Sequence, residues 1–559
     1  IADGLRSELV GEGARFRGHS VTEVLVEACA RWGVEATVRR LVGMFAFGLW
    51  DTRERCLYLV RDRLGIKPLY WAEFGDLFLF GSELKALRAH AGWTPEADRD
   101  SLAGYMRHNY VPGPATIYRR VKKLEPGSML VLPAGGTCKT QAYWRLEDVA
   151  QKGQANRATF GEQEAVDKLE QVLGDAVRRR MVADVPLGAF LSGGIDSSLV
   201  VALMQANSTQ PVRTFSIGFH EQGYDEARHA SEVAVHLGTE HTELYVEAQH
   251  AIDTIPRLAE MFDEPFADSS QIPTLLVSEM TRKHVTVALS GDGGDELFAG
   301  YTRYFQAAGL LPVIGTLPGG LRRAVAAGIR SLPPAGWTTL FGLVPGRWRP
   351  PQPGDKMHKL AGVLSGTTES YYRTLVSHWT EPDRLVLGGS ERRGLLWDRS
   401  VDKIVTDAIE RMQYLDTLTY LPDDILTKVD RTSMAVSLEA RVPLLDHRVA
   451  AFAWSLPPDF KVRDGSGKWL LRQLLLKYVP RRMVDRPKMG FGVPIDAWLR
   501  GPLRDWAEDL LSSDRLRDDG YFDPGQVRQK WAEHLGGGRN WQYLIWDVLM
   551  FQLWKDRWL

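Results

Sequence analysis

The stretch Leu191-Ser192-Gly193-Gly194-Ile195-Asp196-Ser197-Ser198 joins an apolar run typical of a buried strand (185–191) to an amphipathic run typical of a helix (197–204). A strand, a Gly-Gly turn and a helix start present backbone N–H groups and a positive helix end to one point, which suits a phosphate. The glycines let the backbone approach the anion, the serine hydroxyls can donate to it, and Asp196 can hold Mg²⁺. We therefore expect a phosphate site, with a polar helix cap as the alternative. The expected binding residues are Leu191, Ser192, Gly193, Gly194, Asp196, Ser197 and Ser198.

No lysine follows this glycine turn, so it is not the GxxxxGK[ST] loop of the common phosphate-binding NTPases. It resembles the SGGxDS pyrophosphate loop of the N-type ATP pyrophosphatases. Those enzymes activate a group as its adenylate and release pyrophosphate. The resemblance implies ATP as the nucleotide.

A second glycine-rich loop follows a second apolar run, residues 284–289, which we interpret as another buried strand. The loop is Ser290-Gly291-Asp292-Gly293-Gly294-Asp295-Glu296, and an acidic, solvated turn is the alternative interpretation. Ligands gather beyond the carboxyl ends of strands in open α/β sheets. We therefore expect Ser290, Gly291 and Asp292 to line the nucleotide site. Asp196 and Asp295 are the expected ligands of one Mg²⁺ that also contacts the phosphates.

Strands and helices alternate between the two loops, as in a doubly wound fold. Residues 212–219 and 241–246 are typical of strands, and residues 225–237 of a helix. Ile217 lies at the end of its strand, where we expect the adenine to rest.

Six ordered motifs resemble the glutamine-dependent asparagine synthetase family and cover its synthetase half. The resemblance implies an ATP-dependent ligase that forms an amide through an adenylate. The motifs are SGGIDSS (192–198), TFSIGF (214–219) with Tyr224-Asp225-Glu226, DEPFAD (263–268), LSGDGGDELFAGY (289–301), SLEARVPLLDH (437–447) and RPKMGF (486–491).

The N-terminal part resembles the family's class II glutaminase domain, a four-layer αββα sandwich whose nucleophile is an N-terminal cysteine. The sequence given opens with Ile1, and none of Cys29, Cys56 and Cys138 is placed to attack glutamine. Where the family has Ser-Asp-x-Glu-Val, this chain has Ser20-Val21-Thr22-Glu23-Val24. The missing aspartate would pair with the α-ammonium of glutamine, and losing such a partner costs several kcal/mol. Weak glutaminase activity is therefore expected, unless another acid substitutes. The matching stretches are 43–47, 61–70 and 82–87.

The resemblance also implies catalytic residues. Lys488 corresponds to a catalytic lysine, and Tyr301 to the tyrosine of a tyrosine–carboxylate pair whose acid is Asp424, with Asp423 as the alternative. Asp268-Ser269-Ser270 lies where simple asparagine synthetases carry a substrate-binding arginine, which weakens aspartate as the acceptor.

Two acidic positions have structural interpretations. We expect Asp430, which Arg431 follows, to form a structural ion pair at the helix interior. We expect Asp446-His447 to be a structural turn because no nucleophile accompanies it.

The expected architecture is α/β plus α+β. A partial αββα class II glutaminase-like sandwich (1–150) and a linker (151–160) precede a doubly wound ATP pyrophosphatase domain with a helical C-terminal part (161–559). Within the linker, residues 151–158 are polar and without apolar periodicity. Residues 310–353, rich in Pro and Gly, form the least regular region. We interpret them as an insertion beside the synthetase site, with a membrane-surface role as the alternative.

Composition narrows the function classes further. A net charge of −1 gives no electrostatic case for nucleic acid, and no apolar run is long enough to span a bilayer. Three cysteines without a CxxC pattern favour a reducing compartment, so we expect a cytoplasmic protein.

The sequence thus predicts a ligase that uses ATP and Mg²⁺ to join a small-molecule carboxylate to ammonia, to nitrogen from glutamine or to another amine. Asparagine formation is the default. The alternatives are amidation of a natural-product or cell-surface carboxylate, β-lactam-synthetase-like cyclisation and, from a different class, a catalytically dead binding homologue. The sequence leaves open whether the chain forms a homodimer.

Overall fold

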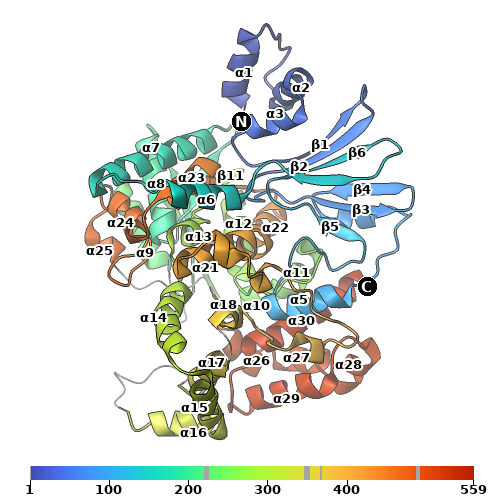
Figure 1. Cartoon of the computed structure of the whole chain (residues 1–559), viewed down its shortest axis with the longest axis vertical. Helices are drawn as coiled ribbons and strands as arrows, with labels where there is room; N and C mark the ends of the chain where they lie inside the picture. Colours follow the sequence, from blue (N-terminus) through green and yellow to red (C-terminus); the bar gives the residue numbers. More distant parts are fainter. Residues whose placement is uncertain (1, 220–225, 345–352, 366–367, 486–491) are drawn as a thin grey trace.

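The computed structural model of the chain describes residues 2–219, 226–344, 353–365, 368–485 and 492–559. Two antiparallel sheets form its N-terminal part, and a parallel sheet surrounded by helices forms its C-terminal part (Figure 1). Lys488 and Tyr224-Asp225, which the sequence motifs single out, lie outside the described residues.

The N-terminal part is a sandwich of two sheets with helices on both outer faces. Its elements are α1 (Ala2–Gly11), α2 (Val21–Trp32), α3 (Val34–Arg40), β1 (Ala46–Asp51), β2 (Cys56–Arg61), β3 (Tyr70–Phe74), β4 (Leu77–Gly81), α4 (Leu84–Arg88), α5 (Arg99–His108), β5 (Val121–Lys123), β6 (Ser128–Pro133) and β7 (Lys139–Ala142). The sheet orders are β1-β2-β6-β7 and β4-β3-β5, with every pairing antiparallel.

Neighbouring residues of a strand face opposite sides of a sheet. The side chains of β2 therefore pack into two different layers, one between the sheets and one under the helices. Leu59 packs between the two sheets with Trp71 of β3, whereas Val60 packs beneath α1 to α3. On the far face of the second sheet, Tyr70 shares a core with Leu102 of α5. The expected αββα layering is therefore confirmed.

The C-terminal part is built on five parallel strands in the order β10-β9-β8-β11-β12. The strands are β8 (Leu187–Phe190), β9 (Arg213–Phe219), β10 (Glu240–Val246), β11 (Val287–Leu289) and β12 (Glu439–Arg441), and the helices beside them include α7 (Glu162–Met181), α8 (Ile195–Ala206), α9 (Ala227–Leu237) and α12 (Gln271–Arg282). Ala189 and Leu289 pack towards α7 and α8, whereas Ile217 and Ala288 pack towards α12. Helices on both faces of a parallel sheet confirm the doubly wound architecture.

The strand order indicates where in this sheet a ligand site is expected. From β8 the chain continues to β9 and β10 on one side, whereas β11 and β12 lie on the other side. Ligand sites of open α/β sheets form where the order reverses in this way. The two glycine loops follow β8 and β11 and therefore meet at this position.

Two local predictions differ from the structure. Only Val287–Leu289 of the expected strand 284–289 pairs in the sheet. Helix α8 is not amphipathic, because every residue from Ser197 to Met204 is buried. It packs against α7 and against α24 (Trp469–Leu475), so the sheet and both helices cover its surface.

The expected irregular linker begins inside a helix. Residues 151–155 complete α6 (Leu146–Ala155), which packs against α23 (His447–Ser455). Leu146 and Ala150 are buried with Trp454. Tertiary packing on α23 therefore orders a segment whose own periodicity is weak. The domain boundaries themselves stay predictions.

The described residues of the region 310–353, which are 310–344 and 353, are mostly helical rather than irregular. They belong to α14 (Thr302–Thr316), α15 (Gly319–Ser331) and α16 (Pro334–Phe341), and α17 (Pro353–Ser365) follows. The prolines at 318 and 333–334 stand at helix starts, where proline is tolerated, so they separate helices without preventing them. The start of α14 borders the cavity described below, and α15 to α17 extend to the lower end of the molecule (Figure 1).

The remaining helices complete the core and connect it to the N-terminal sandwich. The C-terminal helix α30 (Gln542–Trp558) contacts α5 and buries Trp546 and Phe551. In the described part of the chain, none of the helices has the length and apolar composition needed to cross a bilayer. The others are α10 (Ala248–Asp253), α11 (Ile255–Met261), α13 (Gly294–Phe298), α18 (Thr368–Leu375), α19 (Pro382–Leu385), α20 (Val401–Ile404), α21 (Ala408–Leu418), α22 (Leu426–Met434), α25 (Arg481–Val484), α26 (Ile495–Arg500), α27 (Arg504–Leu510), α28 (Ser513–Asp519) and α29 (Pro524–Leu535).

A buried lysine joins the two halves. Lys123 of β5 donates to the backbone oxygen of Val111 at 2.5 Å and contacts Glu264 at 2.8 Å and Asp423 at 3.4 Å. Burial lowers the pKa of Lys123, but Asp423 and Glu264 outweigh it and hold the pKa above its ordinary value. We call Lys123, Glu264 and Asp423 the interface lysine network.

Two further acidic residues have structural roles. Asp430 pairs with Lys67 of the N-terminal part at 3.0 Å rather than with Arg431, because Arg431 is directed at Glu83. The side chain of Asp446 caps α23 by accepting from the backbone N–H of Arg448, as expected of a structural turn.

Candidate active site

The two glycine loops pack directly against each other. A Cβ on Gly291 would lie 2.6 Å from the backbone nitrogen of Ser197, and a Cβ on Gly294 would lie 2.5 Å from Cγ of Asp196. Real Cβ atoms do not approach so closely. Glycine at these two positions is therefore what lets the second loop reach the first.

The first loop turns through Gly193, whose φ of +66° lies in the left-handed region that favours glycine. The hydroxyls of Ser192 and Ser197 are 2.9 Å apart, and the N–H of Gly194 donates to the Ser192 hydroxyl at 3.2 Å. Helix α8 begins at Ile195, directly after this turn. The loop thus holds its serines over the positive end of a twelve-residue helix.

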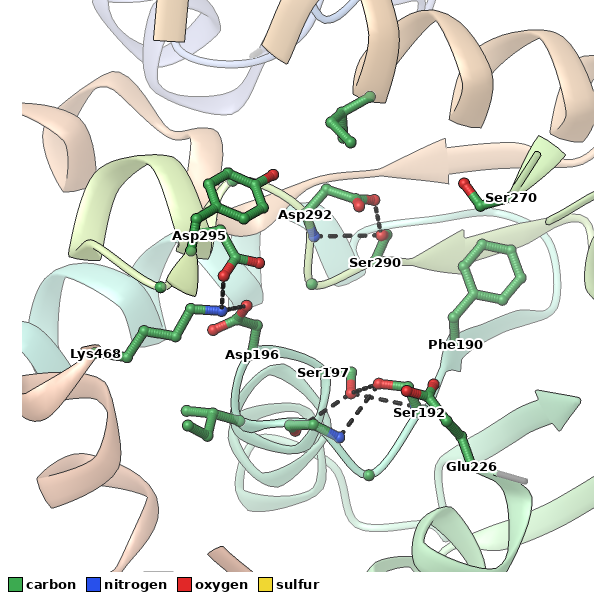
Figure 2. A pocket seen from close by; sticks show the side chains of 18 of the residues that line it. Phe190, Ser192, Asp196, Ser197, Glu226, Ser270, Ser290, Asp292, Asp295 and Lys468 are labelled. Atoms are coloured by element: carbon green, nitrogen blue, oxygen red, sulfur yellow. Dashed lines mark hydrogen bonds and ion pairs between the residues drawn. The ribbon is translucent and has the colours of Figure 1, made fainter. Parts of the chain in front are cut away.

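Lys468 bridges the two loops (Figure 2). Its Nζ contacts Asp295 at 2.9 Å and also pairs with Asp196. Burial lowers the pKa of Lys468, but the two aspartates outweigh this effect and raise it above the ordinary value. We call Lys468, Asp196 and Asp295 the cavity lysine network.

The backbone around Lys468 aims its side chain at the loops. Lys468 has a φ of 57° and stands at the start of α24, after Gly465-Ser466-Gly467. A Cβ on Gly467 would collide with the backbone oxygen of Ala299. Only glycine at 467 therefore allows the segment to pass so close to the second loop.

Two acids of the second loop, Asp292 and Glu296, have raised pKa values. Asp292 accepts from the hydroxyl of Ser290, and burial raises its pKa. Glu296 accepts from the hydroxyl of Tyr301 at 2.6 Å. Burial, followed by the charge of Asp295, raises the pKa of Glu296 to about 7.

A cavity of about 810 Å³ opens between the loops. Ile217 lies on its wall, as do both aspartates of the cavity lysine network. Ser198 is not part of the lining, because it is 1% exposed inside α8. The other expected residues on the wall are Leu191, Ser192, Gly193, Gly194, Ser197, Ser290, Gly291, Asp292 and Tyr301.

The structure does not pair Tyr301 with Asp424, and their catalytic roles stay predictions. Tyr301 donates to Glu296, whereas Asp424 accepts from the side-chain amide of Asn109 at 2.9 Å. The alternative acid, Asp423, accepts from the backbone N–H of Gly113 at 2.7 Å. The reason is local, because both aspartates lie in a π-helical turn, Leu421–Ile425, that directs them at the N-terminal part.

Asp424 lines a second, smaller cavity of about 220 Å³. It shares Asp268 and Tyr420 with the cavity of about 810 Å³ between the glycine loops, which we call the large cavity. It shares His108 and Thr419 with a more extended cleft of about 1350 Å³. The cleft is bordered by residues of both halves. The small cavity therefore lies between the cleft and the two glycine loops.

Asp268 is held by a cation of its own. Lys428 contacts it at 2.5 Å, and the backbone N–H of Ser270 donates to it at 2.9 Å. Three cations line the described wall of the large cavity, namely Lys428, Lys468 and Arg472. Each of the three contacts an aspartate.

In the N-terminal part, Val21 is the first residue of α2 and is 49% exposed. The carboxylate of Glu23 accepts from the backbone N–H groups of Arg17 at 2.7 Å and Gly18 at 3.0 Å. Glu23 is thus used to hold the loop before α2. It does not take the place of the aspartate that the family has at position 21.

The sequence analysis missed Lys468 and Glu296. Lys468 lies 272 residues after Asp196, and a lone lysine is usually a surface charge. The signal was the glycine-rich turn Gly465-Ser466-Gly467 before an apolar helix, which resembles the arrangement of the first loop. Glu296 was visible in the second loop, but its pairing with Tyr301 depends on the tight turn at Ala299, whose φ is 56°.

Comparisons with known proteins agree with this architecture. Residues 168–556 match the family model "Asparagine synthase", and residues 2–144 match "Glutamine amidotransferase domain". Asparagine synthetase (glutamine-hydrolyzing) 1 of Bacillus subtilis is 34% identical over 99% of this chain and 83% of its own length. A putative asparagine synthetase (glutamine-hydrolyzing) of Mycobacterium tuberculosis is 35% identical over 98% of this chain and 82% of its own length. The amidase chry2 of Gibberella zeae is 25% identical over 91% of this chain and 78% of its own length.

Proposed function

The chain belongs to the asparagine synthase family, and we propose that it is an ATP-dependent ligase that adenylates a carboxylate in the large cavity and passes it to ammonia or another amine. The cavity lysine network carries the proposal. It places a buried cation and two carboxylates from opposite loops at the reversal point of a parallel sheet. A nucleoside triphosphate and its metal ion are expected at such a position, where the carboxylates can hold the metal.

Two regions of the cavity would hold the two parts of ATP, its phosphates and its adenine. The first loop offers serine hydroxyls and the N-terminus of α8 to the phosphates. Ile217, 3% exposed on the wall, offers an apolar surface for the adenine. A volume of about 810 Å³ is within the usual range for a small-molecule site.

Asp196 and Asp295 are the proposed ligands of Mg²⁺. Both contact the same ammonium group, so their carboxylates are close together, and Gly294 leaves room for that of Asp196. The described residues include no group of three or more His, Cys, Asp or Glu side chains suited to a metal. Two carboxylates are enough for Mg²⁺ when phosphates complete its shell. When bound, it would neutralise charge on the phosphates.

Lys468 is the proposed cation for the charge that develops during adenylation and amide formation. Fixed positive charge in a partly desolvated site stabilises such transition states strongly. Lys468 is buried and already directed at the loops. The role of Lys488 stays a prediction, and the two lysines are distinguished by experiment below.

Glu296 with Tyr301 is the proposed proton acceptor for the attacking amine. A carboxyl group is an effective general base when its pKa lies near the working pH, and the pKa of Glu296 is raised to about 7. Tyr301 orients it through the 2.6 Å hydrogen bond. A tyrosine–carboxylate pair therefore stands at the cavity, with Glu296 in the place we had expected for Asp424.

The next point is which carboxylate the enzyme converts to an amide. Free aspartate is the default, but each cation on the described cavity wall already contacts an aspartate. No guanidinium stands at Asp268-Ser269-Ser270 to hold an α-carboxylate. These observations favour, as a second candidate, a larger carboxylate recognised by other groups. A homodimer and a cytoplasmic location stay predictions.

The test is an assay with ATP, Mg²⁺, ammonium chloride and a panel of carboxylates that begins with aspartate. Amide products are identified by mass spectrometry, and nucleotide products by chromatography. The proposal predicts an amide together with equal amounts of AMP and pyrophosphate. Formation of the amide with ADP and phosphate would reject the adenylate mechanism.

A further inference from the structure

Arg303, near the start of α14, lies against the ring of Tyr301. Its guanidinium carbon is 3.8 Å from the centre of the Tyr301 ring and 4.9 Å from the centre of the Tyr420 ring. The centres of these two rings are 5.9 Å apart, and their planes meet at 70°. A cation over an aromatic face is attracted by the negative charge of that face. Arg303 therefore holds both tyrosine rings at once.

Asp416 of α21 fixes the guanidinium of Arg303. One of its carboxylate oxygens accepts from Nη2 of Arg303 and from the hydroxyl of Tyr304, each at 2.6 Å. The other oxygen accepts from the hydroxyl of Tyr372 at 2.5 Å, and this hydroxyl accepts from Nε of Arg303 at 3.2 Å. The side chain of Asp416 is 3% exposed. A buried carboxylate with several donors thus leaves Arg303 little freedom to move.

The charge of Arg303 acts on the hydroxyl of Tyr301. Burial lowers the pKa of Arg303, but Asp416 outweighs this effect and raises the pKa above its ordinary value, so the arginine stays charged. Burial raises the pKa of Tyr301, whereas the charge of Arg303 acts in the opposite direction. A hydroxyl next to a cation is a stronger donor. Arg303 therefore strengthens the hydrogen bond from Tyr301 to Glu296.

Arg303 reaches the site from behind Tyr301. Tyr301 and Tyr420 line the large cavity, and Arg303 is not among the described residues that do so. Arg303 and Asp416 line the small cavity instead, together with Tyr420. The arginine can therefore influence the groups in the large cavity through Tyr301 without touching a substrate there.

We propose that Arg303 is a positioning residue that, with Asp416, holds the hydroxyl of Tyr301 on Glu296 and so keeps the proton acceptor oriented towards the attacking amine. The inference rests on the proposed function, in which Glu296 accepts that proton. The competing explanation is that Arg303 only packs α14 against α21.

The charged groups around Glu296 set the sign of the expected pH effects. Burial and then Asp295 raise the pKa of Glu296, and Asp416 raises it further. Lys468, at the start of α24, contacts Asp295, and α23 packs on α13 through apolar residues. Without Arg303 the charge of Asp416 has lost its cation, so the pKa of Glu296 should rise. Without the charge of Asp416 it should fall.

The first test measures turnover across pH in the amide assay with ammonium chloride. Arg303→Met should lower kcat by about ten-fold and change the KM for ATP little, since the lost contact orients the proton acceptor and not the nucleotide. A base must be deprotonated, so the acidic limb of the kcat profile should move to higher pH in Arg303→Met. In Asp416→Asn it should move to lower pH.

The matched control is Arg107→Met. Arg107 also pairs with a buried acid, Glu391, and lies 5.5 Å from the centre of the Trp397 ring, but it lines none of the three described cavities. Its loss should lower the melting temperature without moving the acidic limb. A residue that only packs the fold behaves in this way.

Two further variants test whether Arg303 acts through Tyr301. In a Tyr301→Phe background, Arg303→Met should lower turnover much less than it does in the unmodified protein, because the hydroxyl it positions is already absent. Arg303→Lys keeps the charge without the planar fork and should recover only part of the turnover. Independent, additive losses in the double variant would overturn the proposal.

A crystal structure of Arg303→Met tests the positioning without any turnover. It should show the Tyr301 hydroxyl displaced from Glu296, and an undisplaced hydroxyl would overturn the proposal, as would equal pH profiles of Arg303→Met and Arg107→Met. If thermal unfolding shows that Arg303→Met does not fold, the structure and pH profile of Arg303→Lys decide the same question. Failure of the unmodified protein to form any amide would reject the proposed function, whereas the crystal structure would still test the position of Tyr301.

Discussion

Two buried lysines in this molecule have almost the same surroundings and different roles. Lys468 contacts Asp196 and Asp295, and Lys123 contacts Glu264 and Asp423. In both cases two carboxylates raise the pKa of the lysine against the effect of burial. The exposed fractions of the two lysine side chains are also similar, at 8% for Lys468 and 6% for Lys123.

The difference lies in what surrounds each network. All three members of the cavity lysine network line a cavity of about 810 Å³, so a ligand or ion can reach them. The interface lysine network joins β5 to the C-terminal part, and Lys123 also binds a backbone oxygen there. In the interface lysine network, Asp423 borders the cleft of about 1350 Å³, but Lys123 itself lines none of the three described cavities. Access of the lysine to a cavity, rather than its charge or burial, therefore separates a site that can do chemistry from one that holds two halves together.

The largest expected effect follows from breaking the cavity network. Lys468→Ala should lower turnover by about a thousand-fold or more, because a fixed cation is removed from the transition state. Asp196→Asn and Asp295→Asn should each act as strongly by removing a proposed Mg²⁺ ligand. Steady-state release of pyrophosphate measures all three. Lys488→Ala is the comparison variant, and a greater loss there would mean that Lys488 is the catalytic cation.

The Lys468→Ala variant should also respond to metal more strongly than the unmodified protein does. It removes a cation that both Asp196 and Asp295 contact, and Mg²⁺ can enter the cavity and replace that charge. Added Mg²⁺ should therefore raise its melting temperature more than that of the unmodified protein. An equal response of both proteins would contradict the proposed metal position.

Breaking the interface network should affect stability rather than chemistry. Lys123→Met leaves Glu264 and Asp423 buried without their cation and should lower the free energy of unfolding by about 3–5 kcal/mol. Urea unfolding monitored by tryptophan fluorescence measures the change. Turnover per folded molecule should stay close to that of the unmodified protein, and a loss as large as that of Lys468→Ala would remove the distinction between the networks.

The proton acceptor gives a smaller effect on turnover. Glu296→Gln should lower turnover by about a hundred-fold, since general base catalysis contributes effects of this size. Asp424→Asn is the matched comparison, because it is the same class of change at the residue the sequence favoured. A larger loss in Asp424→Asn would restore the original pairing with Tyr301.

The interface should also respond to acid through His108. Burial, and then the charge of Arg107, lowers the pKa of His108 to about 3 from 6.5. A histidine with a lowered folded-state pKa stabilises the fold above its unfolded pKa and loses that contribution as pH falls. The free energy of unfolding should therefore drop by up to about 1.4 kcal/mol per pH unit between pH 6.5 and 3. Replacing His108 by Gln should flatten this slope, measured by urea unfolding across that range.

The sequence predicted the parts of the site that are contiguous along the chain. Both glycine loops combine a strand, a turn and a helix start within a dozen residues, so their local pattern carries their chemistry. Lys468 was missed because only the fold brings it to Asp196, 272 residues away. The contact of Tyr301 with Glu296 was not predicted for a similar reason, since a π-helical turn directs the expected partner, Asp424, towards Asn109. Contacts that depend on such local distortions have no periodic signal in the sequence.

The smallest expected effect concerns the amine donor. The substitution Val21→Asp would place an acid at the position where the resembled family pairs with the α-ammonium of glutamine. It should increase glutamate release from glutamine while leaving ammonium-dependent turnover unchanged. Efficient glutamine use by the unmodified protein would show that another group holds the ammonium.

Calorimetric titration with ATP tests the central claim most directly, because it needs no knowledge of the acceptor. The account predicts that binding requires Mg²⁺ and that Asp295→Asn weakens it by about ten-fold or more, equivalent to about 1.4 kcal/mol. Asp423→Asn, the same change in the interface lysine network, should bind ATP as the unmodified protein does. Equal affinities for all three proteins, or an equal loss in both variants, would contradict the assignment of the cavity lysine network to the nucleotide.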